Sequence, residues 1–483
     1  MKLDISPQRN VPLVAQVVDQ LSGLILARSL GAGRKLPSIR EFAAVNGISK
    51  STAVEAYDRL VAQGLLTSRP KAGFYVATLR GPVELRSAID LSAQRAIDPI
   101  WMLRNSLQLD PAMLKPGCGW LPAPLLHSEG IARGLRAVSR AGAQALSGYG
   151  EPLGFEPLRR HLQRLLALRG IDAGAGQIML TDSGSQAIDL ALRLLLRPGD
   201  TVLVDDPCYF NFQAVLAVHG AKVVSVPLLA NGPDMAAFAA AAALHRPRLY
   251  LTNGSLHNPT GVTVAPAVAH QLLSLAEQFD FAIVEDDTFA DFEERPSTRL
   301  AALDQLQRVI HIGSFSKTLS GAARCGYLSC CQEWLERLVE LKLATSFGNN
   351  EACARLIHQL LVDGSYRKHM DAVRAHLRGA SVQARRRIKD CGLTLWHEAE
   401  EGLFLWAKAS GGTDCAGIAR DALEQGILLA PGDVFSPART AGNYLRFNVA
   451  QSSDPRIFDF LRTALQLSAF PVASVRPNAL SAS

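Results

Sequence analysis

The sequence predicts an α/β protein in which a small helical module precedes a larger domain with a mostly parallel sheet. Three observations support this arrangement. The chain has 483 residues, which exceeds the usual size of one domain. Helical patterns and a hairpin pattern fill the first 80 residues, whereas strand-like runs alternate with amphipathic helical stretches from residue 178 onward. The net positive charge of the chain also lies entirely in the first of these two regions.

The net charge of +6 lies in residues 1–80, which hold eleven lysines and arginines against five acidic residues, and the rest is balanced. A basic segment on a neutral body indicates an anionic partner for that segment, with a solvated basic surface as the alternative. No apolar run approaches the roughly 18 residues of a membrane-spanning helix, and the N-terminus does not resemble a secretory signal. The eight scattered cysteines favour reduced thiols in a cytoplasm over disulfides or a metal site.

The basic segment has the element order of a winged helix-turn-helix. Ser38, with Glu41 three residues later, and Ser49 are predicted N-caps of the second and third helices. A turn over residues 69–73 separates two short strands. The predicted elements are helices over residues 14–25, 39–46 and 50–64 and strands over residues 65–67 and 74–76.

In a winged helix-turn-helix the opening of the third helix enters the major groove of DNA, while the second helix and the wing meet phosphates. Cations and hydroxyl groups fall at these positions. They are Ser38 and Arg40 on the second helix, Ser49, Lys50, Ser51 and Thr52 at the opening of the third, and Arg69 and Lys71 on the wing. The alternative, a third helix packed against a partner protein, fits the charge surplus less well.

The stretch "GRKLPSIREFAAVNGISKSTAVEAYDRLVAQGLLTSRPKAGFYVA" resembles the DNA-binding domain of the GntR family of bacterial regulators. The resemblance covers about residues 10–78, with helix, turn and wing signals in the family's order. It implies that residues 1–78 form a domain that binds double-stranded operator DNA. Residues 79–105 lose clear periodicity and are predicted to be a linker with some local helix.

Residues 106–470 are predicted to form the α/β domain, with residues 471–483 as a C-terminal tail. Polar motifs follow several of its strands. Residues 181–186 lie between a strand and a helix, where backbone amides can hold a phosphate. The predicted strands cover residues 178–180, 201–204, 222–224, 249–251, 282–284 and 309–312.

Three further motifs in this domain suit pyridoxal phosphate. They are the sequences His-Asn-Pro-Thr-Gly at 257–261, Glu-Asp-Asp at 285–287 and Ser-Phe-Ser-Lys-Thr at 314–318. A lysine can form a Schiff base with the cofactor, a carboxylate can keep its pyridine nitrogen protonated, and hydroxyl groups and cations can hold its phosphate. Taken singly, a loop lysine is more often solvated and an aspartate after a strand often caps a helix. Their joint occurrence in this order favours the cofactor site.

The region from about residue 106 to 470 resembles the fold-type I aminotransferases. The resemblance implies that Lys317 holds the cofactor as an aldimine and that Asp286 pairs with its pyridine nitrogen. It implies that Asn258 bonds the phenolic oxygen and that Tyr209 stacks on the ring. The implied phosphate residues are Ser185, Gln186, Ser314, Ser316 and Arg324.

Two more residues gain roles from this resemblance. Tyr149 is implied to reach the phosphate of the neighbouring subunit, which makes the site depend on a homodimer. Arg446 is implied to bind a carboxylate of the substrate or effector through both of its terminal nitrogens. A surface arginine on an edge strand is the alternative for Arg446.

One position departs from the family's pattern. These folds usually carry a tyrosine two or three residues after the aspartate, where it bonds the phenolic oxygen. This chain has Thr288 and Phe289 there. Phenylalanine cannot donate a hydrogen bond, so we expect cofactor binding to survive better than efficient turnover.

The two resemblances together match the MocR subfamily of GntR regulators. They imply a homodimeric transcription factor that binds operator DNA and senses an amino compound, or pyridoxal phosphate itself, through an aldimine. The alternative is a pyridoxal phosphate-dependent aminotransferase of the 2-aminoadipate or branched-chain and aromatic type with an added DNA-binding domain. A third possibility, a remnant that binds no cofactor, is disfavoured by the retained Lys317 and Asp286.

Overall fold

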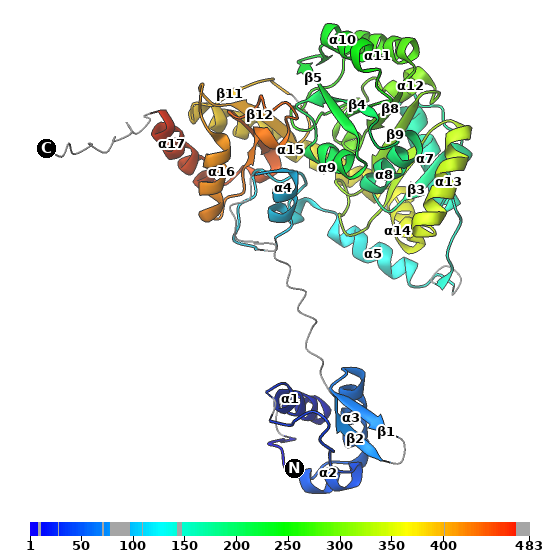
Figure 1. Cartoon of the computed structure of the whole chain (residues 1–483), viewed down its shortest axis with the longest axis vertical. Helices are drawn as coiled ribbons and strands as arrows, with labels where there is room; N and C mark the ends of the chain where they lie inside the picture. The colour runs from blue at the N-terminus through cyan, green and yellow to red at the C-terminus, as the bar shows by residue number, and fades with distance from the viewer. Residues whose placement is uncertain are drawn as a thin grey trace, which may run out of the picture. The chain divides into compact units, whose positions relative to one another are not determined.

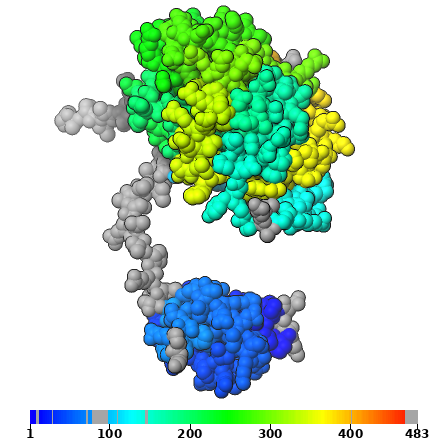
Figure 2. All heavy atoms as spheres, turned by 90° about the vertical axis from the view of Figure 1, so that its right-hand side faces the viewer, coloured from blue at the N-terminus to red at the C-terminus, as the bar shows by residue number. Residues whose placement is uncertain are grey.

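The computed structural model describes residues 1–7, 11–27, 29–69, 72–77, 97–108, 110–142, 147–399 and 401–469. The chain divides into two compact units, residues Met1–Ala93 and Gln94–Ser483 (Figures 1 and 2). Most of the expected linker and the whole expected C-terminal tail lie outside the described residues. Within the described ranges, no helix is long and apolar enough to cross a membrane.

The first unit has the predicted three helices and hairpin. Ser38 accepts a hydrogen bond from the Glu41 amide at 3.2 Å, and Ser49 accepts one from the Thr52 amide at 3.0 Å, so both predicted N-caps are confirmed. The first strand begins one residue later and ends two residues later than predicted. The elements are α1 (Leu13–Leu26), α2 (Ile39–Asn46), α3 (Lys50–Ala62), β1 (Leu66–Arg69) and β2 (Gly73–Val76).

The apolar stripes of these elements meet in one core. Tyr57 of α3 is fully buried between Phe42 of α2 and Phe74 of β2, with ring centroids 5.1 and 5.0 Å away. Val17 and Leu21 of α1 join the same cluster. This packing fixes α3 against the hairpin, so the opening of α3 and the wing belong to one rigid unit.

The second unit is built on an eight-stranded sheet in the order β3-β10-β9-β8-β7-β4-β5-β6. All six predicted strands are present in it. Four neighbouring pairs are parallel, as predicted, whereas β10 is antiparallel to both β3 and β9. The strands are β3 (Ile178–Thr181), β4 (Thr201–Asp206), β5 (Lys222–Leu229), β6 (Gly232–Pro233), β7 (Leu249–Thr252), β8 (Ala282–Asp286), β9 (Val309–Ser314) and β10 (Gly326–Ser329).

Helices cover both faces of this sheet (Figure 1). Successive side chains of one strand point to opposite faces of the sheet. Leu203 of β4 therefore packs in one core cluster, whereas Val202 and Val204 pack in the other. The helices are α5 (Ser128–Val138), α7 (Glu156–Leu168), α8 (Gly184–Leu195), α9 (Phe210–Val218), α10 (Met235–His245), α11 (Pro266–Phe279), α12 (Leu300–Asp304), α13 (Gln332–Ser346) and α14 (Glu351–Val362).

A smaller antiparallel sheet, in the order β11-β12-β14-β13, completes the second unit. The long helix α15 (Ser365–Asp390) precedes it. The remaining elements are β11 (Thr394–Leu395), β12 (Phe404–Lys408), α16 (Cys415–Glu424), β13 (Ala430–Pro431), β14 (Tyr444–Asn448) and α17 (Pro455–Ala469). Helix α4 (Pro99–Ser106), which falls mainly within the expected linker range, contacts α9 and so belongs to this unit.

Candidate functional site

A cavity of about 120 Å³ lies at the carboxyl ends of β4, β7, β8 and β9, the edge where parallel sheets place ligands. Most of the predicted cofactor and carboxylate residues line it: Ser185, Tyr209, Asn258, Asp286, Ser314, Ser316, Lys317, Arg324 and Arg446. A larger groove of about 740 Å³, lined by residues of α16 and α17, contains none of these side chains.

Lys317 lies just beyond β9, and its Nζ atom sits 5.3 Å from the ring centre of Trp120. Burial lowers the pKa of Lys317, which increases the neutral fraction of its amine. A neutral amine is the form that attacks an aldehyde. Trp120 was not identified from the sequence, because a single aromatic residue in a loop carries no periodic signal.

Asp286 ends β8 and is 5% exposed. The backbone amide and the hydroxyl of Thr288 both donate to its Oδ1 atom. Burial raises the pKa of Asp286, so its charged form gains most from a cation in the cavity. The Thr288 hydroxyl is therefore committed to Asp286, and Phe289, which also lines the cavity, cannot replace the missing tyrosine.

The next residue, Asp287, anchors this strand end on its other side. Its Oδ2 atom accepts hydrogen bonds from Arg299 Nε and His311 Nε2, both at 3.1 Å, and Ser255 donates to Oδ1 at 2.8 Å. Although burial opposes ionisation, Arg299 and His311 hold the pKa of Asp287 well below its usual range. A fixed Asp287 just beyond β8 helps to hold the adjacent Asp286, the last residue of the strand, at the cavity.

Arg446 lies on β14, which pairs with β12 on one side and β13 on the other, and it is 1% exposed. The alternative of a surface arginine on an edge strand is therefore excluded. Its Nη1 atom donates to Asn258 Oδ1 at 2.7 Å and Nη2 donates to the carbonyl of Gly117. Since Asn258 accepts through Oδ1, its amide NH₂ is the group that can donate to a cofactor oxygen.

The guanidinium of Arg446 lies over two aromatic rings, with centroids 4.6 Å away for Phe404 and 4.7 Å away for Phe435. No carboxylate pairs with it among the residues that the structure describes, and its Nε atom has no hydrogen-bond partner there. Burial lowers the pKa of Arg446 to about 10. A buried cation in this state favours an anionic ligand, since an opposite charge offsets the cost of its desolvation.

Residues 181–186, which we call the phosphate loop, run from the last residue of β3 into the first turn of α8. The Ser183 hydroxyl accepts from the Gln186 amide at 3.0 Å and caps α8. A Cβ atom at Gly326 of β10 would lie 2.5 Å from the Ser183 carbonyl carbon, so glycine is required for this close approach. The loop thereby places the N-terminus of α8 at the cavity, where its amides suit an anion.

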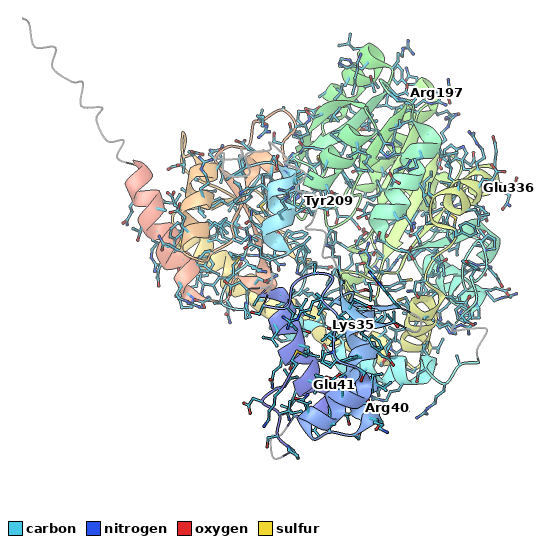
Figure 3. The ribbon with its side chains drawn as sticks, turned by 60° about the horizontal axis from the view of Figure 1, so that its bottom comes forward. Lys35, Arg40, Glu41, Arg197, Tyr209 and Glu336 are labelled. Atoms are coloured by element: carbon cyan, nitrogen blue, oxygen red, sulfur yellow. The ribbon has the colours of Figure 1, made fainter. Side chains whose placement is uncertain are left out.

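Two predicted cofactor residues lie outside the cavity of their own chain. The Gln186 side chain accepts from the Asp182 amide at 2.7 Å and donates to Ser346 at 3.2 Å, so it supports the loop from outside. Tyr149 is 81% exposed and packs against Phe347, with ring centroids 5.6 Å apart. By contrast, Tyr209, which is labelled in Figure 3, is the N-cap residue of α9 and lines the cavity.

In the first unit the described residues that are predicted to contact DNA lie on α2, at the start of α3 and on β1, or directly before these helices. Arg40 is exposed on α2 (Figure 3), and no described residue forms an ion pair with it. The Ser49 hydroxyl contacts the Ser51 and Thr52 hydroxyls at 2.7 and 2.8 Å, in addition to capping α3. Lys71 lies outside the described residues.

The structure adds Lys35 to the wing. Backbone hydrogen bonds at 2.9 Å join residues 33–36 to β2, and Lys35 pairs directly with Tyr75. Because residues alternate between faces, Leu36 points to the core while Lys35 shares the solvent face with Tyr75 and Arg69. The Tyr75 ring centre is 5.8 Å from Lys35 Nζ and 4.5 Å from Arg69 Cζ. No sequence pattern indicated this third segment, because it is too short for a strand signal.

The cavity fits pyridoxal phosphate on three observations. It combines the half-buried amine of Lys317, a buried carboxylate at Asp286 that has no ion pair among the described residues, and the helix N-terminus of the phosphate loop. These groups suit an aldehyde, a pyridinium nitrogen and a phosphate, respectively. No group of three or more potential metal ligands occurs in the described part of the chain.

Comparison with known proteins assigns both units. Residues 127–462 match the family "Aminotransferase class I and II", and residues 13–76 match "Bacterial regulatory proteins, gntR family". The HTH-type transcriptional regulator TauR of Rhodobacter capsulatus is 30% identical over 87% of this chain and 89% of its own length. The probable rhizopine catabolism regulatory protein MocR of Rhizobium meliloti is 30% identical over 66% of this chain and 65% of its own length.

Among solved structures, the α-aminoadipate aminotransferase LysN of Thermus thermophilus matches with a TM-score of 0.69 and 25% identity. The match covers 76% of this chain and 95% of LysN. The second unit therefore has the complete aminotransferase fold, and the first unit supplies a separate DNA-binding domain. The chain belongs to the class I and II aminotransferase family and, with its GntR-type domain, to the MocR subfamily of pyridoxal phosphate-binding transcriptional regulators.

Proposed function

We propose that this protein is a homodimeric regulator whose second unit binds pyridoxal phosphate and senses an amino compound that carries a carboxylate. The observation that carries the proposal is Arg446, a buried cation without an acidic partner among the described residues, in the same cavity as Lys317 and Asp286. The chain joins this cavity to a DNA-binding unit. Effector binding can control DNA binding if the effector favours one arrangement of the dimer by a few kcal/mol.

Each residue has a distinct task in this proposal. When bound, pyridoxal phosphate supplies an aldehyde that condenses with amines and a ring that withdraws electrons. Lys317 provides the protein's amine, Asp286 keeps the ring nitrogen protonated, and the Asn258 amide donates to the phenolic oxygen. Arg446 binds the effector's carboxylate through two parallel hydrogen bonds, once Asn258 and Gly117 release its nitrogens or share them.

The exposure of Tyr149 supports the homodimer. The resemblance to aminotransferases gives this tyrosine a role at a phosphate, yet it is 81% exposed and outside the cavity of its own chain. A second copy of the chain would bring Tyr149 to the partner's cavity. The site would then be complete only in the dimer.

A working aminotransferase is the second candidate. The retention of Lys317, Asp286 and Arg446 in one cavity favours it, because these groups suffice for cofactor and substrate binding. The commitment of the Thr288 hydroxyl to Asp286, together with Phe289, weakens it, since the phenolic oxygen loses a donor.

One experiment separates the two candidates. A gel-shift assay uses DNA from upstream of the protein's own gene, at stated salt, with and without pyridoxal phosphate and a panel of amino acids. A specific shift that responds to these ligands supports the regulator. Absence of a specific shift, combined with amino-group transfer to 2-oxoglutarate in the same preparation, would support the aminotransferase.

The Arg40→Ala variant is expected to weaken DNA binding equally at every sequence. Arg40 is exposed on α2, where this motif meets phosphates, so its loss removes a backbone contact and lowers the salt slope of log K by about 1. Ser51 and Thr52 variants should instead change sequence preference. Both expectations are tested by measuring the affinity of each variant for specific and for random DNA over a range of salt concentrations. A loss of affinity in Arg40→Ala that is limited to one DNA sequence would contradict the assignment of Arg40 to a phosphate contact.

The Tyr75→Leu variant is expected to weaken DNA binding by about 2–5-fold, whereas Tyr75→Phe should bind normally. The ring of Tyr75 attracts both Lys35 and Arg69 and so offsets the repulsion between these two cations. Cation–π contacts of this kind contribute about 0.5–1 kcal/mol at exposed sites. Phenylalanine keeps the ring and loses only the hydroxyl, which donates to the Ala72 carbonyl. Equal losses in both variants would show that the hydroxyl, and not the ring, is the important group.

A further inference from the structure

Lys342 of α13 is a fully buried lysine that the proposed function does not use. Its Nζ atom donates to the Pro152 carbonyl at 2.7 Å, the Leu180 carbonyl at 2.9 Å and Asn349 Oδ1 at 2.9 Å. An ammonium group has three donors, and all three are satisfied here. No carboxylate forms an ion pair with Lys342 in the described ranges, and burial lowers its pKa to about 8.

The three acceptors of Lys342 come from three separate segments. Pro152 lies three residues after Tyr149, and Leu180 lies on β3 directly before the phosphate loop. Asn349 lies in the turn between α13 and α14. A buried charge is expensive unless its hydrogen bonds are held in good geometry. The ammonium of Lys342 therefore favours one relative placement of these three segments.

Further hydrogen bonds connect the phosphate loop to the C-terminal end of α13 and to the turn between α13 and α14. The Asn350 amide donates to Asp182 at 3.0 Å, and Gln186 donates to Ser346 at 3.2 Å. Gln186 also binds the Asp182 amide, so both loop residues act together. A shift of the phosphate loop must therefore move this turn or break these bonds.

The same turn carries an exposed aromatic contact. Phe347 has a left-handed backbone (φ 61°) and is 72% exposed, and its ring packs against Tyr149. Two large aromatic side chains exposed side by side are typical of a surface that another protein covers. Since Tyr149 is the residue proposed to reach the partner subunit, a second copy of this chain is the occupant that we assign to this pair.

We propose that Lys342 is a positioning residue that couples the phosphate loop to the Tyr149–Phe347 pair, so that cofactor binding and dimerisation strengthen each other. The proposal rests on the proposed function, which supplies the cofactor and the homodimer. Phosphate binding would order the loop, and the bonds through Lys342, Asp182 and Gln186 would order the aromatic pair. By linkage, the factor by which the cofactor tightens the dimer must equal the product of the factors by which dimerisation raises the affinities of its two cofactor sites.

The test measures the dimer dissociation constant by sedimentation with and without pyridoxal phosphate. We expect the cofactor to tighten the wild-type dimer by about 5–150-fold, the usual range for coupled sites. Lys342→Met keeps the length of the side chain without its donors and should lower this factor clearly while still binding the cofactor. Lys222→Met, at an exposed lysine of β5, is the matched control and should keep the full factor.

A second variant covers the case in which Lys342→Met does not fold. Ser346→Ala changes an exposed side chain and breaks the Gln186 contact, so it should lower the coupling factor without loss of folding. An unchanged factor in either folded variant would overturn the proposal, as would a wild-type dimer that ignores the cofactor. A wild-type chain that neither dimerises nor binds pyridoxal phosphate would instead overturn the proposed function itself.

Discussion

Replacement of Lys317 by alanine is expected to abolish the visible or near-ultraviolet absorption band that pyridoxal phosphate gives when a lysine holds it. Lys317 is the lysine that lines the cavity, and burial lowers its pKa, which favours the neutral and reactive amine. The variant should also lose the cofactor on dialysis, because only the noncovalent contacts of the phosphate and ring remain. Absorption spectra before and after dialysis measure both effects.

The Lys408→Ala variant is a matched control for this experiment. Lys408 also lies over an aromatic ring, with its Nζ atom 5.6 Å from the centre of Tyr444, but it is outside the cavity. Its loss should leave the band unchanged. A band of normal intensity in Lys317→Ala would mean that another amine holds the cofactor.

Replacement of Arg446 by alanine is expected to remove the spectral response to amino acids and to leave pyridoxal phosphate bound. The response should weaken by at least about 100-fold, because hydrogen bonds to charged groups contribute about 1.5–3 kcal/mol each and about 1.4 kcal/mol corresponds to a tenfold change. Arg446 has no acidic partner in the described structure, so its removal leaves no buried charge unpaired. The variant should therefore fold, although Asn258 and Gly117 each lose a donor.

Titration of the holoprotein with amino acids, followed by absorption, tests this expectation. Arg446→Lys keeps the charge but loses the planar fork, and it should give an intermediate response. Arg456→Ala, at an exposed arginine of α17, should respond like the wild type. An undiminished response in Arg446→Ala would show that the effector is not anchored by a carboxylate at this position.

Local patterns along the chain specified much of this architecture. The caps Ser38 and Ser49 and the apolar periodicity of 14–25 predicted the helices of the first unit, because capping and amphipathicity depend on residues only a few positions apart. Five of the six strand-like runs form the parallel core of the large sheet, and the sixth is β3, which pairs with the antiparallel β10. The polar motifs that follow those strands predicted the cavity, since the carboxyl ends of parallel strands meet at one edge.

Other features depend on contacts between residues far apart in the sequence. The antiparallel β10, the interior position of Arg446 on β14 and the placement of Lys35 beside Tyr75 require strand pairing that no local pattern specifies. Gln186 stands beside Ser185 in the sequence, yet it faces Ser346, about 160 positions away.

Lys342 shows this division most clearly. In the sequence it is one lysine on an amphipathic helix, for which an exposed side chain is the ordinary expectation. Its burial depends on three acceptors that β3, the segment after Tyr149 and the turn after α13 bring together. The order of residues was enough to predict which helices, strands and motifs the chain contains. Which polar groups satisfy one another away from water follows from tertiary packing, because that pairing requires the complete three-dimensional arrangement.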